Sequence, residues 1–446
     1  MTSGLDTAAS FQVPVARMTL ASGLRVVVSA EHSAPVVCVA VYYGVGMRLE
    51  PRGRTGFAHL FEHLMFQGSP QMAKMELVGL VQANGGLLNG STRTDFTNYF
   101  EVMPSHTLEL ALWMEADRMR GPVITQAELD NQRDVVKNEI RVNVLNRPYG
   151  SFPWIDMQER AYTNWHNAHN GYGDMVDLDA ASMADVRAFF DAYYSPANAA
   201  LVVVGDAEPA EVFEMAQRYF EGIPAALAPP QAEIDEPPQE EEKRFTRVDP
   251  LAPTPAIAIA YHTPPAGTPE YYALGLLHEA LAEGDDALLH AELVSKRGYA
   301  SEVDGGINFL GHMHNARTPL LWCVTLVHDA EVTADAILEA FDAVIEGVRE
   351  HGLDAGALAR SRTKARASLF STIAGYIPGF GLADLLASFE LIEGDASRVN
   401  DLDARFAAVT PDLVAQVARD YLKRENRVIL ELHAGAAVVA ESEAAS

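Results

Sequence analysis

The sequence predicts an α+β fold of two similar α/β-sandwich domains, each a mostly antiparallel sheet covered by helices. The chain has 446 residues, which is too long for one ordinary hydrophobic core. An order of helix, polar turn and apolar strand occurs twice, and a stretch rich in Pro and Glu lies between the two occurrences. We therefore expect one domain over 1–223, a linker over 224–255 and a second domain over 256–446.

Paired strands and a helix open the first domain. Residues 18–48 contain two runs rich in β-branched residues that are separated by a polar turn, which is typical of paired strands. Residues 56–66 contain good helix formers and end at the stop signal Gly68-Ser69-Pro70. The other elements expected before residue 145 are a Gly-broken strand pair over 85–103 and helices over 108–119 and 125–144.

The repeated segment order occurs at residues 183–204 and again at 411–432, where Tyr194 and Tyr421 take equivalent places. This single match is slight evidence for a duplication. The intervening residues 224–255 are poor in aromatic side chains, as interdomain linkers often are. A Pro-rich peptide-docking segment is the alternative, and the central position of the stretch favours a linker.

Composition and charge are those of a globular protein that does not bind nucleic acid. The chain is 48% hydrophobic and 21% charged, as in ordinary globular proteins. Its 33 Lys and Arg against 61 Asp and Glu give a net charge of −28, which argues against binding nucleic acid. The acidic surface either serves solubility alone, the simpler interpretation, or attracts cationic peptides.

The cysteines and the N-terminal sequence indicate the cellular compartment to expect. Cys38 and Cys323 both lie in apolar runs, which predicts buried thiols and neither a disulfide framework nor a Cys-based zinc site. No apolar run reaches the roughly 18 residues of a membrane span. The N-terminus lacks a basic segment followed by an apolar one, so we expect a cytoplasmic protein, or a periplasmic one if a leader has been removed.

The motif that carries chemistry is His59-x-x-Glu62-His63 on the helix expected over 56–66. Residues four apart share a helix face, so both imidazoles can bind one ion while Glu62 lies beside it. The order is the inverse of the H-E-x-x-H zincin motif. A catalytic zinc site needs three protein ligands and an open position for water. We expect Glu62 to take the proton of that water as a general base.

Two other interpretations of the motif are a chance match and a solvated helix face. The helix is too apolar for a solvated face, because Phe57, Leu60, Phe61 and Leu64 surround the motif. Burying two His and one Glu without a partner would be costly. Manganese or cobalt at the same ligands stays open, since geometry and availability decide among such metals.

These residues resemble the pitrilysin and insulysin family of inverzincin metallopeptidases, and the likeness extends beyond the motif. The family places a third zinc ligand on a later helix, and the segment DNQRDVVKNEIRVN matches it. The resemblance therefore implies that Glu139 completes a site for one Zn²⁺ per chain. The segment DVRAFFDAYYSPANAALVVVGD also resembles the end of the family's first domain.

The segment GGLLNGSTRTDFTNYFEVMP resembles the family's edge strand, to which a substrate peptide adds as a further strand. The resemblance implies substrate contacts at Leu88, Asn89, Gly90 and Ser91. Asn89 would lie near the scissile bond, and the equally strong alternative is an Asn that satisfies its own backbone.

The length resembles the short two-domain branch that includes mitochondrial processing peptidase, whose chains pair around a chamber. Catalytically complete members supply an Arg and a Tyr to the substrate carbonyl, and these positions fall here at Val294 and Ser301. Valine cannot donate a hydrogen bond, and serine is shorter than tyrosine. Arg297 and Tyr299 lie nearby, but their spacing differs from that of the family pair.

These departures imply the zinc-bearing half of a heterodimer whose homologous partner supplies the Arg and the Tyr. Gln132 replaces a Glu of many relatives, and we expect it to keep a hydrogen bond that steadies a zinc ligand. The sequence thus predicts a zinc-dependent endopeptidase subunit that hydrolyses peptides or short unfolded polypeptides. The alternative is a non-catalytic structural or assembly subunit. The complete set of His59, Glu62, His63 and Glu139 favours the enzyme.

Overall fold

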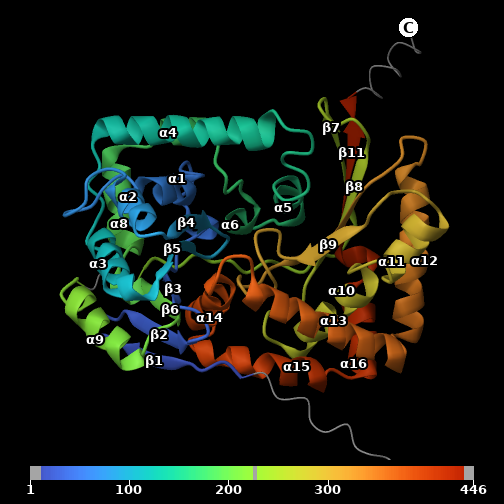
Figure 1. Cartoon of the computed structure of the whole chain (residues 1–446). Helices are drawn as coiled ribbons and strands as arrows, with labels where there is room; N and C mark the ends of the chain where they lie inside the picture. Colours follow the sequence, from blue (N-terminus) through green and yellow to red (C-terminus); the bar gives the residue numbers. More distant parts are fainter. Residues whose placement is uncertain (1–11, 225–228, 436–446) are drawn as a thin grey trace, which may run out of the picture.

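Apolar runs such as Val36–Tyr43 and Ala256–His262 form the central strands of two separate sheets, one in each half of the chain. The computed structural model describes residues 12–224 and 229–435. Figure 1 shows the first sheet on the left and the second on the right, each with its own helices. No helix in these two ranges is long and apolar enough to cross a membrane.

The first half contains, in order, β1 (Ala16–Thr19), β2 (Arg25–Ala30), β3 (Val36–Tyr43), α1 (Phe57–Leu64), α2 (Glu76–Ala83), β4 (Leu87–Thr92), β5 (Thr97–Pro104), α3 (Leu108–Met119), α4 (Gln126–Ile140), α5 (Asp156–Ala161), α6 (Trp165–Ala168), α7 (Met175–Asp179), α8 (Met183–Tyr193), β6 (Ala199–Gly205) and α9 (Pro209–Phe220). The second half contains β7 (Lys243–Asp249), β8 (Ala256–His262), α10 (Pro269–Leu281), α11 (Leu288–His290), β9 (Asp304–Ile307), β10 (Leu321–Val327), α12 (Ala334–His351), α13 (Ala355–Ala374), α14 (Phe380–Ile392), α15 (Leu402–Ala408), α16 (Pro411–Tyr421) and β11 (Arg427–Ala434).

The two sheets share one topology except for β1, which has no counterpart in the second sheet as described. The first has the strand order β1-β2-β6-β3-β5-β4, and the second has the order β7-β11-β8-β10-β9. In each sheet one pair is parallel, β2 with β6 and β7 with β11, and the other pairs are antiparallel. The predicted pair of similar, mostly antiparallel domains is therefore confirmed. The repeated helix, turn and strand correspond to α8 with β6 and to α16 with β11.

The linker predicted over 224–255 is too long. Lys243–Asp249 forms β7, which pairs in parallel register with β11 at the edge of the second sheet. The sequence concealed this strand because its side chains alternate between partly buried and exposed, and the exposed ones are polar except Val248. A charged edge strand of this kind discourages pairing with other chains. Residues 225–228 of the expected linker lie outside the described residues.

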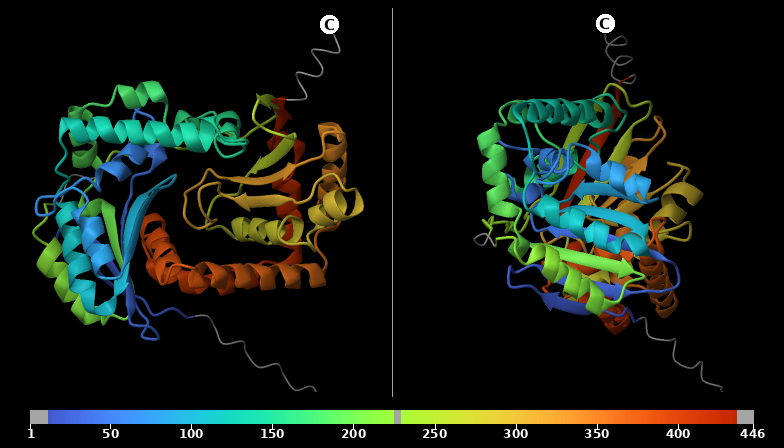
Figure 2. Two further views of the ribbon diagram at one scale, coloured as in Figure 1. Left: turned by 45° about the horizontal axis from the view of Figure 1, so that its top comes forward. Right: turned by 60° about the vertical axis from the view of Figure 1, so that its left-hand side comes forward.

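Each half covers a sheet face of the other. α14 from the second half packs on β3 and β6, and the rings of Phe100 and Phe380 stack with centroids 3.9 Å apart. In return, Met157 and Tyr162 of the α5 region share a core cluster with apolar residues of β8, β10 and β11. Figure 2 shows α4 and α13 crossing between the halves at opposite edges of the molecule. The two domains are thus joined by exchanged helices.

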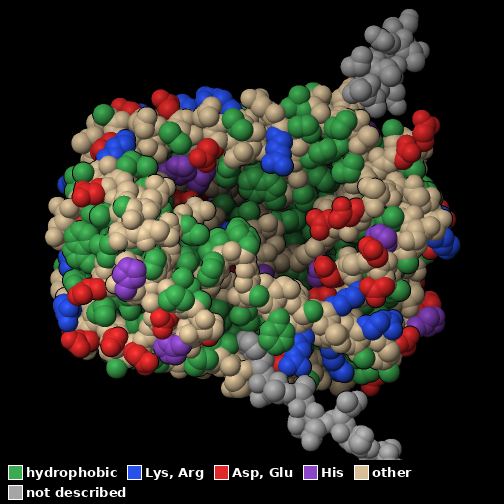
Figure 3. Space-filling model, viewed as in Figure 1, with side chains coloured by type: hydrophobic (Ala, Val, Ile, Leu, Met, Phe, Trp, Pro, Cys, Tyr) green, Lys and Arg blue, Asp and Glu red, His purple; other side chains and the backbone are tan. Residues whose placement is uncertain are grey.

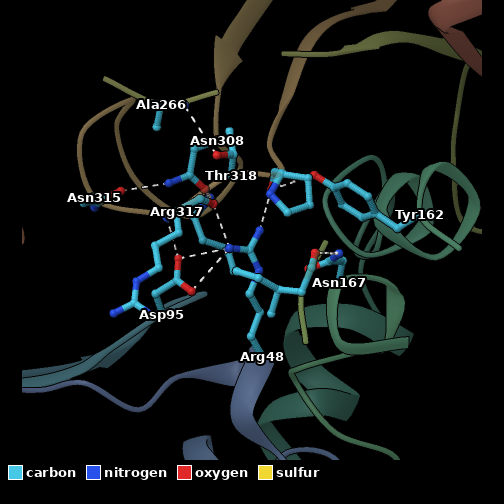
Figure 4. A network of polar contacts seen from close by, with 12 residues as sticks. Arg48, Asp95, Tyr162, Asn167, Ala266, Asn308, Asn315, Arg317 and Thr318 are labelled. Atoms are coloured by element: carbon cyan, nitrogen blue, oxygen red, sulfur yellow. Dashed lines mark hydrogen bonds and ion pairs between the residues drawn. The ribbon is translucent and has the colours of Figure 1, made fainter. Parts of the chain in front are cut away.

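A buried arginine ties the loop before β10 to the first half (Figure 4). Arg48 is 3% exposed and donates to the Asp95 carboxylate at 3.2 Å and to the backbone oxygen of Arg317 at 2.7 Å. The Arg317 N–H donates in turn to Asp95 at 2.7 Å. Because each charge has a partner, the network links the halves without leaving a buried charge uncompensated.

Cys38 and Cys323 are buried free thiols, as predicted.

The buried carboxyl group of Glu279, in the second half, makes the stability of the protein depend on pH. The side chain of Glu279 is 7% exposed, and its Oε2 has no hydrogen-bond partner among the described residues. Burial, together with the charge of Glu283, raises the pKa of Glu279 to about 7, although Lys364 opposes the shift. The folded protein therefore holds this proton more tightly than the unfolded chain does.

We expect Glu279→Gln to stabilise the protein at pH 8 by about 2 kcal/mol and to have little effect near pH 4.5. The cost of the ionised carboxylate appears as pH rises from the unfolded value of about 4.5 to about 7, and it is constant above that range. Urea unfolding at both pH values measures the difference. Glu339→Gln, on an exposed site of α12, is the matched control. An equal gain at both pH values would contradict the assignment.

Candidate metal centre

The helix α1 begins at a buried carboxylate. Gly56, at φ 77°, precedes its first residue, and Glu50 accepts hydrogen bonds from the N–H groups of Gly56 at 2.9 Å and Ala58 at 2.8 Å. A negative charge is favourable at a helix N-terminus. Burial raises the pKa of Glu50, and its 3.1 Å contact with His169 partly opposes this. Glu50 and His169, which come from two separate segments of the chain, therefore fix the start of α1.

Three side chains converge at one point above this helix. His59 and His63 on α1 have their Nε2 atoms 3.3 Å apart. Glu139, near the end of α4, places its carboxylate oxygens 3.4 Å from His59 Nε2 and 3.6 Å from His63 Nε2. These residues are the only group of three or more His, Cys, Asp or Glu in the described ranges whose ligand atoms could hold one metal ion.

The three separations fit a zinc ion. Ligands at roughly 2.0–2.2 Å from a tetrahedral zinc lie about 3.3–3.6 Å from one another. The distances among His59, His63 and Glu139 cover this range. The donor set of two imidazoles and one carboxylate also suits a catalytic zinc site, in which three protein ligands leave the fourth position open.

Charge at the centre favours a bound cation. Hydrogen bonds from His59 and His63 lower the pKa of Glu139 to about 2, so this carboxylate is ionised at neutral pH. Burial lowers the pKa of His63, but Glu139, Glu62 and a contact with Gln132 outweigh burial and raise it overall. Gln132 is 7% exposed and lies about two turns before Glu139 on the same face of α4. Gln132 contacts His63, and its role in steadying this ligand stays a prediction.

The side chain of Glu62, on α1, faces the edge strand β4. Its Oε2 accepts a 2.7 Å hydrogen bond from the Thr92 hydroxyl. A Cβ at Gly90 would lie 3.3 Å from Glu62 Cγ, so a larger residue would crowd the glutamate. The missing side chain lets the strand pass close to Glu62. The carboxylate is therefore placed beside the metal ligands and beside an open strand edge.

The four expected substrate-binding residues all lie on β4, which is an outer strand of the first sheet. Gly90 faces α1, and Leu88 packs against the core that contains α1. Asn89 and Ser91 point to the opposite face because side chains alternate along a strand. Asn89 Oδ1 accepts from the Gly90 N–H at 2.9 Å, which is the local contact foreseen as the alternative. The substrate contacts of these residues stay predictions.

The positions expected for the family's Arg and Tyr lie far from this centre. Val294 belongs to the short helical segment Ala291–Lys296, which directly follows α11. Figure 1 places α11 at the side of the second half that is remote from α1. Arg297 is engaged locally, since it donates to Glu292 at 2.7 Å and to the Tyr299 hydroxyl at 3.2 Å.

Sequence reasoning missed an aromatic wall of the centre. The Tyr172 ring stacks on the His59 imidazole with centroids 4.7 Å apart and an interplanar angle of 20°. Asn143 donates to the Tyr172 hydroxyl at 3.1 Å. The available signal was the sequence Gly171-Tyr172-Gly173, in which glycines flank a tyrosine. Glu50 and His169, which support the start of α1, carried no motif at all.

A hollow lies between the two halves on the face shown in Figure 3, with apolar side chains above it and to its left and acidic side chains on its right. In the same orientation, Figure 1 shows β4 on one side of this region and β9 on the other.

The family model described as "Insulinase (Peptidase family M16)" matches residues 25–148, which include the metal ligands and Glu62. The model described as "Peptidase M16 inactive domain" matches residues 180–365. The chain belongs to the M16 peptidase family.

Two bacterial relatives match nearly the whole chain, and a mitochondrial one matches part of it. Zinc protease PqqE of Helicobacter pylori is 27% identical over 410 residues, which cover 91% of this chain and 90% of that protein. An uncharacterised zinc protease of Streptomyces coelicolor is 27% identical over 433 residues, with 92% and 88% covered. The human mitochondrial cytochrome b-c1 complex subunit 1 is 24% identical over 274 residues, with 60% and 55% covered.

Solved structures match the same two-domain M16 architecture. The crystal structure of a protease from Helicobacter pylori has a TM-score of 0.87 at 26% identity, and the match covers 95% of this chain and all of that one. The first half of the periplasmic protease PqqL from Escherichia coli has a TM-score of 0.76 at 17% identity, with 95% and 93% covered. The short two-domain M16 form predicted from the sequence is therefore confirmed, and the chain is similar to zinc proteases.

Proposed function

We propose that this chain is a zinc-dependent endopeptidase subunit that hydrolyses peptides or short unfolded polypeptides. The observation that carries the proposal is the placing of His59, His63 and Glu139 at the separations of a tetrahedral site, with Glu62 beside them. The relatives named zinc proteases support the choice of metal and reaction. One Zn²⁺ per chain would be held by the three ligands.

The bound ion would supply Lewis-acid polarisation of the peptide carbonyl and would make a coordinated water more acidic. Glu62 takes a proton from the attacking water through the carboxylate oxygen that Thr92 does not occupy. It then carries that proton to the amine of the departing peptide. The edge of β4 orients an extended substrate through backbone hydrogen bonds, and Gly90 lets that substrate lie close to Glu62.

We also propose that a homologous chain completes the site and that the pair is fully active only as a heterodimer. Two observations support this. Val294 and Ser301 cannot perform the roles of Arg and Tyr at a substrate carbonyl. The segment after α11 that carries these positions lies away from the chain's own α1. We therefore assign the Arg and the Tyr to the homologous chain.

A non-catalytic assembly subunit is the rival, because a relative is a subunit of the mitochondrial cytochrome b-c1 complex. The intact ligand set and Glu62 favour the enzyme, since a scaffold has no need of three converging metal ligands. We propose a cytoplasmic location. The periplasmic location of PqqL makes the other compartment the alternative to test by fractionation.

Elemental analysis and chelation test the proposal. The purified protein is expected to contain one zinc ion per chain, and peptidase activity on a mixture of quenched fluorogenic peptides should fall at least about tenfold on chelation and return with zinc. Removing the metal takes away the polarisation of the carbonyl, which is a large part of the catalytic effect. The assay is run on the chain alone and with a homologous chain that carries the Arg and Tyr. A chain without metal, inactive in both assays, would support the assembly subunit.

A further inference from the structure

The segment that carries Tyr172 is built against the start of α1. Gly173, at φ 106°, and Gly56 approach so closely that a Cβ on Gly173 would lie 2.7 Å from Gly56 Cα. Only two glycines allow this backbone contact at positive φ. Asp177 accepts hydrogen bonds from the N–H of Thr55 at 3.0 Å and from its hydroxyl at 2.8 Å. Tyr172 is therefore held in place by residues that directly precede the metal motif.

The ring of Tyr172 fixes the orientation of the His59 imidazole, which a hydrogen bond usually does. A histidine that binds a metal normally donates its second ring N–H to an acceptor, which fixes the plane of the imidazole. The buried Nδ1 of His59 has no hydrogen-bond partner within the described ranges. Instead, the Tyr172 ring lies nearly parallel to this imidazole at 4.7 Å. The indole of Trp154 meets Tyr172 edge-on at 5.4 Å and supports it.

The hydroxyl of Tyr172 is oriented but keeps its own proton available. Asn143 donates to the hydroxyl oxygen at 3.1 Å, so one lone pair is occupied. No residue of 12–224 or 229–435 is seen to accept the hydroxyl proton. The ring that carries this hydroxyl stacks on the imidazole of the metal ligand His59 with centroids 4.7 Å apart, so the hydroxyl lies beside the metal centre. A free O–H at this place is a hydrogen-bond donor for a group that enters the centre.

We propose that Tyr172 is a catalytic residue whose hydroxyl donates a hydrogen bond to the carbonyl oxygen of the scissile peptide, while its ring positions His59. The inference rests on the proposed peptidase function. It assigns to this chain a donor near the reacting carbonyl, where Val294 and Ser301 offer none. Such a donor contributes most when negative charge develops on that oxygen, so it acts on the transition state more than on the bound substrate.

Tyr172→Phe separates the two roles because it keeps the ring and removes the hydroxyl. We expect kcat to fall by about 10²-fold or more, with KM changed by less than about threefold. Affinity for a phosphinic peptide, whose tetrahedral oxygens resemble the transition state, should fall by at least about tenfold. Zinc affinity, measured by competition with a chromogenic chelator, should stay as in the wild type. Tyr172→Ala should weaken zinc binding as well, since it also removes the ring.

Tyr219→Phe is the matched control, because its hydroxyl bonds Glu109 on the surface at 2.7 Å, away from the metal centre. Unchanged kcat and phosphinic-peptide binding in Tyr172→Phe would overturn the proposal. Loss of zinc from Tyr172→Phe would also overturn it, since the hydroxyl would then act through the fold. Glu62→Gln, measured in parallel, distinguishes the cases. If it abolishes activity while Tyr172→Phe does not, only the inference about Tyr172 fails.

Discussion

Glu62→Gln is expected to lower kcat by about 10²- to 10⁴-fold while one zinc ion stays bound. The amide has nearly the shape of the carboxylate, and its oxygen can still accept the hydrogen bond that Thr92 donates at 2.7 Å. It cannot take a proton from the attacking water. The three metal ligands are other residues, so their separations should not change. The effect therefore isolates proton transfer from metal binding.

The measurement combines kinetics with metal analysis on the same preparation. Steady-state kcat and KM come from a fluorogenic peptide, and zinc content comes from elemental analysis. KM should change little, because Glu62 forms no part of the strand edge that binds the peptide backbone. Glu211→Gln, an exposed substitution on α9, serves as the control for charge removal. Full activity in Glu62→Gln would refute the general base and, with it, the proposed mechanism.

His59→Ala or Glu139→Gln should be inactive for a different reason, the loss of bound zinc. Comparing these variants with Glu62→Gln thus divides the centre into residues that hold the ion and a residue that moves a proton. A protein serving only as a scaffold would show no such division. Its assembly would be insensitive to all three substitutions.

The residues of the metal centre could be predicted from the sequence better than the residues that hold them in place. His59 and His63 were recognisable because a four-residue spacing on an apolar helix has one geometric meaning. Glu139 required the family resemblance, since nothing in its own segment shows that α4 passes over α1. Tyr172 escaped notice because its place depends on the close contact of Gly56 with Gly173, two residues far apart in the chain. Contacts of this kind leave no periodic pattern.

The same distinction holds for the fold. Strands with continuous apolar runs, such as β3 and β6, were predicted because both of their faces are buried. β7 was not, since an edge strand with polar side chains looks like a linker in composition. The packing of α14 on the first sheet and of α5 on the second also lies beyond sequence reasoning, because an apolar helix face does not specify which sheet it covers.

Arg118→Met is expected to destabilise the protein by about 3–5 kcal/mol at pH 8. Arg118, on α3, is 2% exposed and pairs with Glu101 on β5 and with Glu115 on its own helix, both of them 1% exposed. Burial and the charge of Glu115 raise the pKa of Glu101 well above its ordinary value. The Arg118 guanidinium therefore supplies the positive charge that balances carboxylate charge in this buried cluster. Without Arg118, the buried carboxylate has no counter-charge.

The destabilisation should shrink as pH falls, and the sign follows from the carboxyl groups. Once the arginine is absent, nothing opposes the burial that raises the folded-state pKa of Glu101 above the unfolded value of about 4.5, so the penalty grows as pH rises beyond that value. Urea unfolding of wild type and variant at pH 5 and pH 8, at one fixed zinc concentration, tests this. A penalty that does not depend on pH would mean that lost packing dominates.

A triple variant, Arg118→Met with Glu101→Gln and Glu115→Leu, should recover most of the stability, since it removes the charges together. It should also show whether the cluster matters for the site. The Arg118 guanidinium lies 4.6 Å from the centre of the Tyr99 ring, and a Cβ at Gly90 would lie 3.3 Å from that ring. Recovered stability with a raised KM would indicate that the guanidinium also supports β4 through Tyr99. Recovered stability with unchanged KM would limit the role of Arg118 to the core.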